Sequence, residues 1–396
     1  MAETSVRIPQ IQSAMEDAGV DAVVLRLAEN VVLATRWYVQ IPGLAIVVIG
    51  RSGGATLLVP EYEAEEAAAV WAGAIRTFPA IRHDGPAPGA EIERHLRDLA
   101  TEYGAAGGAV GFEGSFETIA PGSIHGEPNA VALPTQALLK RTFATEELRD
   151  FTEPLEAMRA IKTDDEIEAI RRTNEIAVFG LEAFKENAVP GKTEVEVMAA
   201  VEHAIATRGH GYKGARWVRG FCTVYSGPDL ADGWKYWRAR TRAIEPGDAV
   251  MLELGTVADG YWSDHTRTVV AGRANPRLRE AYEAVQAAVR AGFAAARPGA
   301  TGDDVDRASR EACAAAGFTQ FPHHTGHGTG FRYHETRPQL VPGGRDVLSA
   351  GNVIITEPGI YGSELGGGVR HEDNAVVTQE GAAAVLATTS YEFELS

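Results

Sequence analysis

The sequence predicts a mixed α/β (α+β) chain of two domains, and three observations lead to this prediction. Its 396 residues exceed the length of about 250–300 residues at which a single hydrophobic core stops growing. Short apolar runs alternate with helical stretches over residues 1–140. Two β-hairpin patterns separated by helices occupy the later part of the chain. We expect a small α/β domain at residues 1–145 and a second domain at residues 146–396, with the boundary in a charged helical stretch over residues 145–162.

The first domain is predicted from its strands and helices in turn. The runs AVVLRL, GLAIVVIG and ATLLVP are apolar, rich in branched residues and bounded by Gly, Pro or Asn, as expected of buried strands. The segments EYEAEEAAAVWA and GAEIERHLRDLATEYG have helical periodicity, and Gly104 suits the C-cap of the second. No catalytic residue types gather in this part of the sequence, so we expect the chemistry to lie in the second domain.

The helices of the second domain are predicted from their first residues. Thr163 with Glu166, and Thr193 with Glu196, have the spacing of a capping box, in which each side chain satisfies the other residue's free amide. Two further helices are expected over residues 276–297 and 303–316. The two hairpin patterns between and after these helices indicate two related halves packed about a shared sheet.

The amino-acid composition narrows the range of possible partners and cellular compartments. The chain is 45% hydrophobic and 23% charged, as in ordinary globular proteins, and its net charge of −17 argues against nucleic acid or an anionic membrane as a partner. Cys222 and Cys313 are too few for a disulfide framework, so a reduced, cytoplasmic setting is the simplest interpretation. The N-terminus lacks the pattern of a signal peptide, and no apolar run is long enough to span a membrane.

The first hairpin pattern, AVMLELGTVADGYWSDHTRTVVAG, brings two acidic residues together. Residues 250–254 and 266–270 are strand-like, and Asp259-Gly260 is a strong turn signal. A turn there places Glu253 and Asp264 on adjacent strands, opposite or diagonal to each other and within reach of one ion. One acid could instead be a solvated strand residue and the other a turn cap, but Glu253 interrupts an apolar run that has the character of a buried strand.

The second hairpin pattern, NVIITEPGIYGSELGGGVRHEDNAVVT, repeats this logic. Glu357 ends an apolar strand directly before Pro358-Gly359, and Glu372 is expected on the returning strand. Arg370 would share the face of Glu372 by strand alternation, which would make it a supporting partner of this carboxylate.

A histidine-rich run, HHTGHGTGFRYHE, lies between the two hairpins. It contains His323, His324, His327 and His334, and such a concentration among the chain's 11 histidines favours a site over isolated structural roles. Gathered carboxylates raise one another's pKa, and a divalent cation neutralises them. Oxygen ligands with an imidazole suit Mn, Fe, Co or Zn. The pattern therefore predicts a metal-dependent hydrolase.

The conjunction of these motifs resembles a known family. The segments are VYSGPD, PGDAVMLELG, GYWSDHTRT, TGHGTGFRYHE, ITEPGIY and VRHEDN. In this order they resemble the pita-bread family of methionine aminopeptidase, aminopeptidase P, prolidase, creatinase and ectoine hydrolase, and most of all its Xaa-Pro peptidase branch. The resemblance covers the chain from about MRAIKTDDEIEAIRR to the end. It implies a creatinase-like N-terminal α/β domain at residues 1–145 and a pita-bread metallohydrolase domain at residues 146–396.

The resemblance also implies the roles of individual residues. One or two divalent ions (Mn, Co, Fe or Zn) would be held by Glu253, Asp264, His327, Glu357 and Glu372. A metal-bound hydroxide would attack the amide carbonyl next to proline, and Glu357 would carry the proton to the leaving nitrogen. His334 would stabilise the tetrahedral intermediate, His323 would line the substrate pocket, and Arg370 would orient Glu372. A peptide substrate and a homodimer are implied as well.

Two departures from the family pattern limit this transfer. Glu253 stands where the family has an Asp, and its extra methylene shifts the carboxylate oxygens by about 1.5 Å, whereas ligand distances tolerate about 0.2 Å. We therefore expect weakened or altered occupancy of one metal position. The family peptidases also have a histidine after Ser-Gly-Pro, where this chain has Trp234 or Tyr236. Tyr236 could donate a hydrogen bond to substrate, and Trp234 could stack on a ring or a cation.

Three functions follow from these residues. The first is an Xaa-Pro aminopeptidase or dipeptidase. The second is a C–N hydrolase of a small amidine or guanidino compound, similar to ectoine hydrolase or creatinase, with reduced or no metal and with Glu253 as acid, base or nucleophile. Ectoine hydrolase resembles this chain in having Glu at that position, and creatinase works without metal. The third is a scaffold that only binds partners, and the near-complete ligand set weighs against it.

Overall fold

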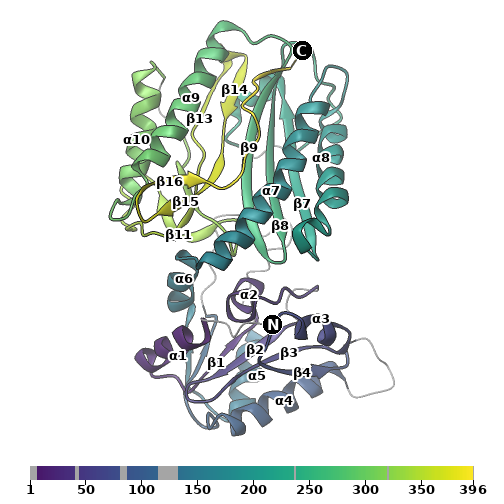
Figure 1. The fold of residues 1–396 in the computed structure, drawn as a ribbon, viewed down its shortest axis with the longest axis vertical. Helices are drawn as coiled ribbons and strands as arrows, with labels where there is room; N and C mark the ends of the chain where they lie inside the picture. The colour runs from purple at the N-terminus through teal and green to yellow at the C-terminus, as the bar shows by residue number, and fades with distance from the viewer. Residues whose placement is uncertain are drawn as a thin grey trace. The chain divides into compact units, whose positions relative to one another are not determined.

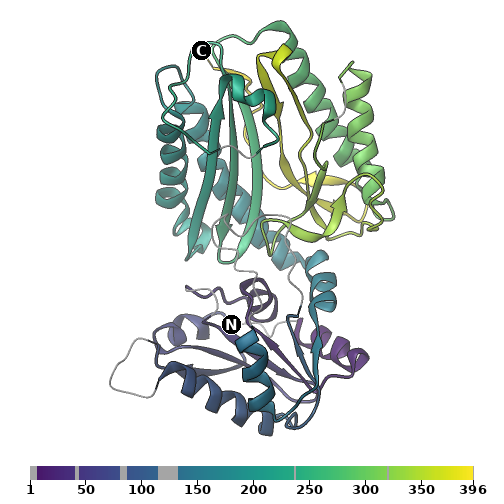
Figure 2. The same cartoon turned by 180° about the vertical axis from the view of Figure 1, so that it is seen from behind.

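The computed structural model of the protein describes residues 7–40, 44–80, 87–114, 133–235, 238–318 and 321–395. The chain divides into two compact units, Met1–Arg159 and Ala160–Ser396, which Figure 1 and Figure 2 show from opposite sides. Each unit contains both helices and strands, which confirms the predicted mixed α/β class.

The first unit is built on a six-stranded mixed sheet in the order β4-β3-β2-β1-β5-β6. Its strands are β1 (Ala22–Leu25), β2 (Ile46–Gly50), β3 (Ala55–Pro60), β4 (Ala74–Phe78), β5 (Val110–Phe112) and β6 (Leu148–Asp150). The three apolar runs form β1, β2 and β3, as predicted, because almost all of their residues are buried on both faces of the sheet. β1 pairs antiparallel with β2 and parallel with β5.

The helices of the first unit depart from the predictions at two places. They are α1 (Arg7–Ala18), α2 (Ala28–Thr35), α3 (Ala64–Ala68), α4 (Pro88–Glu102), α5 (Leu133–Phe143) and α6 (Thr152–Ala160). The segment 61–72 is a 3-10 turn followed by the short α3, not one helix. The stretch 145–162 contains β6 before α6, because Leu148, Arg149 and Asp150 pair with β5. Gly104 has the positive φ (65°) expected directly beyond a helix end.

The second unit begins with two long helices against a sheet. α7 (Asp164–Asn187) and α8 (Glu194–Gly209) both start with the predicted capping boxes. They cover the sheet β17-β9-β8-β7, whose strands are β7 (Val218–Ser226), β8 (Ala249–Ala258), β9 (Tyr261–Ala271) and β17 (Glu394–Leu395). Ile176 of α7, Val201 of α8 and Leu252 of β8 belong to the buried core between these helices and the sheet.

The remaining strands form separate sheets, so the expectation of one shared sheet was wrong. One sheet has the order β11-β10-β12-β15-β16, with β10 (Gly326–Gly328), β11 (Glu335–Leu340), β12 (Val353–Thr356), β15 (Asp373–Thr378) and β16 (Gly381–Val385). Within the described part of the chain, β13 (Gly359–Gly362) and β14 (Gly367–Arg370) pair only with each other. The predicted helices α9 (Pro276–Ala295) and α10 (Gly302–Ala315) lie beside these strands (Figure 1), with α9 against β13, β14 and β16 and α10 against β11.

The hairpin β8–β9 has the predicted turn. Asp259 and Gly260 both have positive φ, 49° and 85°, as a two-residue turn that matches strand twist requires. In the resulting register Glu253 faces Thr266, and Asp264 faces Gly255. Glu253 and Asp264 are therefore diagonal neighbours on adjacent strands, as the sequence predicted.

The second hairpin is broken in its middle. β12 pairs with β15 up to Thr356 and Asp373, and β13 pairs with β14 from Gly359 and Arg370. Glu357 and Glu372 lie in the two short gaps between these strands, so Glu372 is not on a returning strand as expected. The break passes the chain from one sheet to another and leaves both carboxyl groups at the junction.

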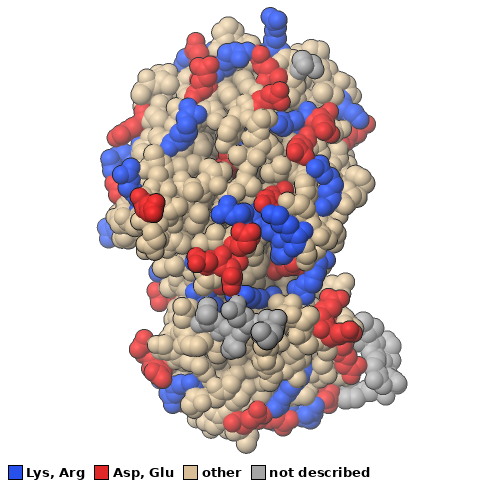
Figure 3. All heavy atoms as spheres, viewed as in Figure 1, with Lys and Arg blue, Asp and Glu red and all other residues tan. Residues whose placement is uncertain are grey.

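The described surface agrees with the composition. Figure 3 shows acidic and basic side chains interspersed over one face, without a large area of either sign. Among the described residues, no helix combines the length and apolar character needed to cross a bilayer.

Candidate metal centre

Three carboxyl groups from separate segments lie together in the second unit. Glu253 on β8, Asp264 on β9 and Glu372 after β14 each offer an oxygen, and these oxygens lie within 4.8 Å of one another. The three residues are at most 3% exposed. Burial raises the pKa of Asp264 and the pKa of Glu372 well above their usual values, and the neighbouring carboxylates raise both further. A bound cation would relieve this crowding.

Glu253 is enclosed by hydrogen-bond donors. The Tyr333 hydroxyl donates to Oε1 of Glu253 across 2.8 Å, and the Thr266 hydroxyl lies 2.8 Å from Oε2. The guanidinium of Arg370 forms an ion pair with the same Oε2. Both carboxylate oxygens of Glu253 therefore have partners within the protein itself.

Thr266 joins the two sides of the acidic group. Its hydroxyl lies 2.8 Å from Oε2 of Glu372 and accepts a bond of 3.1 Å from Nε of Arg370. Oε1 of Glu372 makes no hydrogen bond with any described residue. Arg370 is thus linked to Glu372 by two hydrogen bonds that share the Thr266 hydroxyl.

His327 on β10 has one ring nitrogen fixed and the other directed into the site. Nδ1 lies 2.8 Å from the carbonyl oxygen of Gly328, so Nδ1 carries the proton, because a carbonyl can only accept. Nε2 makes no hydrogen bond within the described chain and lies 3.6 Å from Oε1 of Glu357. Burial lowers the pKa of His327 to about 4, which keeps the ring neutral and its Nε2 lone pair available. Histidines that bind metals have this arrangement.

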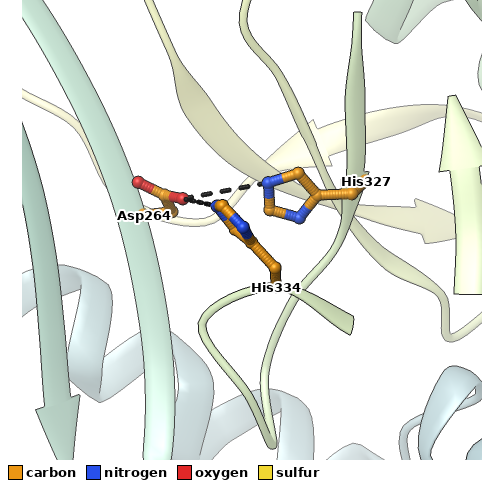
Figure 4. A group of neighbouring side chains, drawn as sticks. All are labelled: Asp264, His327 and His334. Carbon is orange, nitrogen blue, oxygen red and sulfur yellow. Dashed lines mark hydrogen bonds and ion pairs between the residues drawn. The ribbon is translucent and has the colours of Figure 1, made fainter. Parts of the chain in front are cut away.

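His327 and His334 approach the same carboxylate. Figure 4 shows both rings directed toward Asp264, whose Oδ2 lies 3.9 Å from Nε2 of His327 and 3.2 Å from Nε2 of His334. The Tyr333 ring stacks on His334 with 4.4 Å between centroids. Burial and the neighbouring His327 lower the pKa of His334 well below its usual value. A neutral His334 can donate to Asp264 through Nε2.

Glu357 is bordered by a second imidazole. Nε2 of His324 lies 2.7 Å from Oε1 of Glu357, and these two groups with His327 form another set of potential ligands. The His324 side chain is 29% exposed, whereas that of Glu357 is 6% exposed. Burial opposes ionisation of Glu357, but His324 and His327 outweigh it and hold the pKa of this carboxyl far below its usual value.

His323 lies at the edge of this group. Its Nδ1 bonds to the carbonyl oxygen of His324 at 2.8 Å, and its Nε2 lies 3.0 Å from the hydroxyl of Tyr361. Burial lowers the pKa of His323 to about 4. The ring is therefore a neutral hydrogen-bonding group beside Glu357.

A buried clamp holds the backbone at Glu372. Arg267 donates to the carbonyl oxygen of Glu372 across 2.6 Å and pairs with Oδ1 of Asp373 at 2.5 Å. Tyr391 and His371 bond to the other oxygen of Asp373 at 2.9 and 3.1 Å. These contacts fix the segment that carries Glu372 against β9.

Of the two substrate-binding candidates after Ser-Gly-Pro, the structure describes only Trp234. Trp234 follows the 3-10 turn Gly227–Asp232 and is 42% exposed, with Nζ of Lys235 at 5.2 Å from its ring centroid. Tyr236 lies outside the described residues.

The sequence reasoning missed three residues that contact the site: Thr266, Tyr333 and His324. Thr266 lies two residues after Asp264, on the same face of β9, which was a readable signal. His324 lay in the histidine-rich run without an assigned role. Nothing in the local sequence placed Tyr333 against Glu253.

The donor set fits a divalent cation beside the histidines. Nε2 of His327, Oδ1 of Asp264 and Oε1 of Glu372 are buried and make no hydrogen bond with the described residues. Buried polar atoms without partners are uncommon in folded proteins. Carboxylates together with imidazole suit Mn, Fe, Co or Zn. Glu253 fits less well, because both of its oxygens already accept hydrogen bonds.

Comparison with known proteins explains this constellation. The model of metallopeptidase family M24 matches residues 168–379, which is more than half of the chain. The chain belongs to metallopeptidase family M24. The model of the creatinase/prolidase N-terminal domain matches residues 7–161. These matches confirm the pita-bread resemblance and the predicted order of an N-terminal α/β domain before the catalytic domain. Metallopeptidases of this family use divalent metals.

Individual relatives agree with the family. The probable dipeptidase PepE of Mycobacterium tuberculosis is 38% identical over 237 residues, which cover 59% of this chain and 60% of the relative. The Xaa-Pro dipeptidase of Pyrococcus furiosus is 37% identical over 247 residues, 61% of this chain and 67% of the relative. Because the match spans only about three fifths of PepE, these names suggest an activity without establishing it.

Solved structures match over nearly the whole length. The prolidase from Pyrococcus horikoshii OT3 has a TM-score of 0.78 and 28% identity, and the match covers 98% of this chain and 99% of that one. The Xaa-Pro dipeptidase from Bacillus anthracis has a TM-score of 0.80 and 27% identity, with 99% of both chains covered. The M24 chain thus has the architecture of these proteins in both units.

Proposed function

We propose that this chain is a metal-dependent peptidase that hydrolyses the amide bond next to proline in a dipeptide or at a peptide N-terminus. The observation that carries the proposal is the convergence of His327, Glu357 and Asp264, with a neutral imidazole lone pair directed between carboxylates. Relatives named Xaa-Pro dipeptidase and prolidase supply the substrate class.

In this proposal His327, Glu357, Asp264 and Glu372 would hold the cation. A divalent cation in such a site acidifies water and polarises a carbonyl group. Glu357, whose pKa is held low by His324 and His327, is ionised at neutral pH and accepts a proton for delivery to the leaving nitrogen. His334 is a neutral imidazole whose Nε2 lies beside Asp264, and in this proposal its single N–H turns from Asp264 to the oxygen that gains charge during hydrolysis.

The test is a panel of Xaa-Pro dipeptides against matched Xaa-Ala dipeptides, with metal-free protein and added Mn²⁺ or Co²⁺. We expect cleavage that needs the ion, prefers proline and stops on chelation. His327→Ala should lower kcat/KM at least about 100-fold through loss of a ligand. His203→Ala, which changes an exposed histidine on α8, should leave it unchanged. Equal rates with and without metal, or no cleavage of any Xaa-Pro bond, would refute the proposal.

A second candidate is hydrolysis of a C–N bond in a small amidine or guanidino compound. Two observations favour it: the enclosed position of Glu253 beside Arg370, and a sequence after Ser-Gly-Pro without a histidine. It predicts turnover of such compounds in the presence of a chelator, with less than about one ion per chain. Stoichiometric metal required for turnover would exclude it.

We also propose a reduced cytoplasmic setting and a homodimer. Cys222 and Cys313 are both free thiols, as a reducing compartment permits. The dimer follows from the family resemblance alone, and light scattering on purified protein measures it directly.

A further inference from the structure

The candidate centre has an acidic end, formed by Glu253, Asp264 and Glu372, and a histidine end, formed by His324, His327 and Glu357. The carboxylates of the two ends differ in what they already bind. At the acidic end, Glu253 accepts from Tyr333 and contacts Thr266, while Arg370 neutralises its charge. Tyr333 is fully buried among Phe221, Trp262 and His334, so its hydroxyl cannot swing away without disturbing this packing.

The histidine end has the opposite character. His327 presents Nε2 without a hydrogen bond to any residue that the structure describes, and its Nδ1 is anchored to the Gly328 carbonyl. His324, His327 and Glu357 each offer one ligand atom, and these three atoms lie within 4.8 Å of one another. Ligand atoms around a tetrahedral Zn²⁺ stand about 3.4 Å apart when the bonds are near 2.1 Å. The distance of 3.6 Å between Nε2 of His327 and Oε1 of Glu357 is close to that spacing.

His324 is free to serve as a ligand in a way that His334 is not. Nε2 of His334 already bonds to Asp264 at 3.2 Å, which occupies the nitrogen that faces the site. Nε2 of His324 faces Glu357 at 2.7 Å, a contact that a shared cation would replace by two ligand bonds. Its side chain is also partly exposed, so it can turn slightly without cost to the core.

We propose that this chain holds a single cation at the histidine end, with His324 as an additional ligand beside His327 and Glu357, while Tyr333 and Arg370 close the position at Glu253. This inference rests on the proposed metal-dependent function and specifies its centre. Asp264, whose Oδ2 lies 3.9 Å from Nε2 of His327, and Glu372 supply the remaining oxygen ligands, as in the proposed function. Glu253 then acts as the anchor of Arg370 and not as a metal ligand.

The experiment uses the full chain, stripped of metal and titrated with Zn²⁺ as the probe. We expect one tightly bound equivalent, and X-ray absorption at the zinc edge should count two imidazoles. His324→Ala should reduce the count to one and raise the Kd at least about tenfold. Tyr333→Phe, which removes only the hydroxyl on Glu253, should leave the imidazole count at two.

A histidine outside the site serves as the control for His324→Ala. His203→Ala should change neither the Kd nor the imidazole count, because this exposed histidine lies on α8. Two equivalents bound with similar affinity, one imidazole in the unmodified chain, or an unchanged Kd in His324→Ala would each overturn the inference. Metal-dependent Xaa-Pro cleavage with a one-imidazole site would overturn it and leave the proposed function standing. A two-imidazole site without Xaa-Pro cleavage would refute only the proposed function.

Discussion

The hydroxyl of Thr266 lies 2.8 Å from a carboxylate oxygen of Glu372 and 2.8 Å from one of Glu253. A hydroxyl has one proton, so it can donate to only one of these carboxyl groups at a time. The other contact is satisfied when that carboxyl group is itself protonated, in keeping with the raised pKa of Glu372. Thr266 therefore couples the charge states of the two acids.

Thr266→Val tests this coupling, since valine keeps the shape and removes the hydroxyl. Two buried carboxylates would lose a partner, and we expect the free energy of unfolding to fall by about 1–3 kcal/mol. We also expect metal affinity to drop about 10–100-fold, as when a supporting bond to a ligand is lost. Urea unfolding and a metal titration measure the two effects.

Thr256→Val is the matched control on the neighbouring strand. Thr256 is fully buried on β8, and its hydroxyl has no hydrogen-bond partner among the described residues. Replacing it should leave stability unchanged or raise it, because no bond is lost. Equal destabilisation by both substitutions would show that the Thr266 hydroxyl has no special role.

Glu253→Asp is expected to alter the number of bound ions. The shorter side chain withdraws its oxygens by about 1.5 Å from Tyr333 and Arg370. The carboxylate would then be open to a cation beside Asp264 and Glu372. Elemental analysis after Mn²⁺ loading should rise from about one ion per chain toward two.

Glu253→Gln is the control for this change. It keeps the length of the side chain and its contact with Tyr333, so the ion count should stay near one. A substitution to Asp that leaves the count at one, with the fold intact by circular dichroism, would contradict the idea that length closes this position.

The β8–β9 half of the site could be predicted from sequence for a local reason. Strand alternation and the Asp259-Gly260 turn set the register, and the register alone places Glu253 diagonal to Asp264. The helix starts at Thr163 and Thr193 were equally local, because a capping box involves residues three apart.

The other half depended on contacts between distant segments. The junction that displaces Glu357 and Glu372 from regular strands depends on which sheets the chain joins, and the local pattern does not state this. Tyr333 reaches Glu253 across 80 positions of the chain. Its hydroxyl contact is a result of tertiary packing, so no periodicity or turn signal could reveal it.

The pair of Arg267 and Asp373 should contribute strongly to the stability of the second unit. Both side chains are at most 5% exposed, so Arg267→Met would leave a buried carboxylate without its cation. Such a loss costs about 3–5 kcal/mol. Adding Asp373→Asn removes that charge, and we expect the double variant to regain part of the stability in urea unfolding. A double variant less stable than Arg267→Met would show that the charge on Asp373 is satisfied by Tyr391 and His371 alone.

Glu113 in the first unit should make stability depend on pH. Burial raises the pKa of Glu113 to about 7, despite hydrogen bonds from Asn30 and from the backbone of Arg26 and Leu27. The folded chain therefore keeps this proton between about pH 4.5 and pH 7, where the unfolded chain loses it. The stabilising contribution is complete below about pH 4.5 and is lost as the pH rises through about 7.

Glu113→Gln removes this proton exchange and should flatten the pH dependence. Relative to the variant, the unmodified chain should lose up to about 3 kcal/mol between pH 4.5 and pH 7, because each pKa unit corresponds to about 1.4 kcal/mol. Urea unfolding at several pH values measures the difference, with Glu65→Gln as the control at an exposed position of α3. The same slope in Glu113→Gln and in the unmodified chain would mean that Glu113 is ionised in the folded state, held by its three N–H donors.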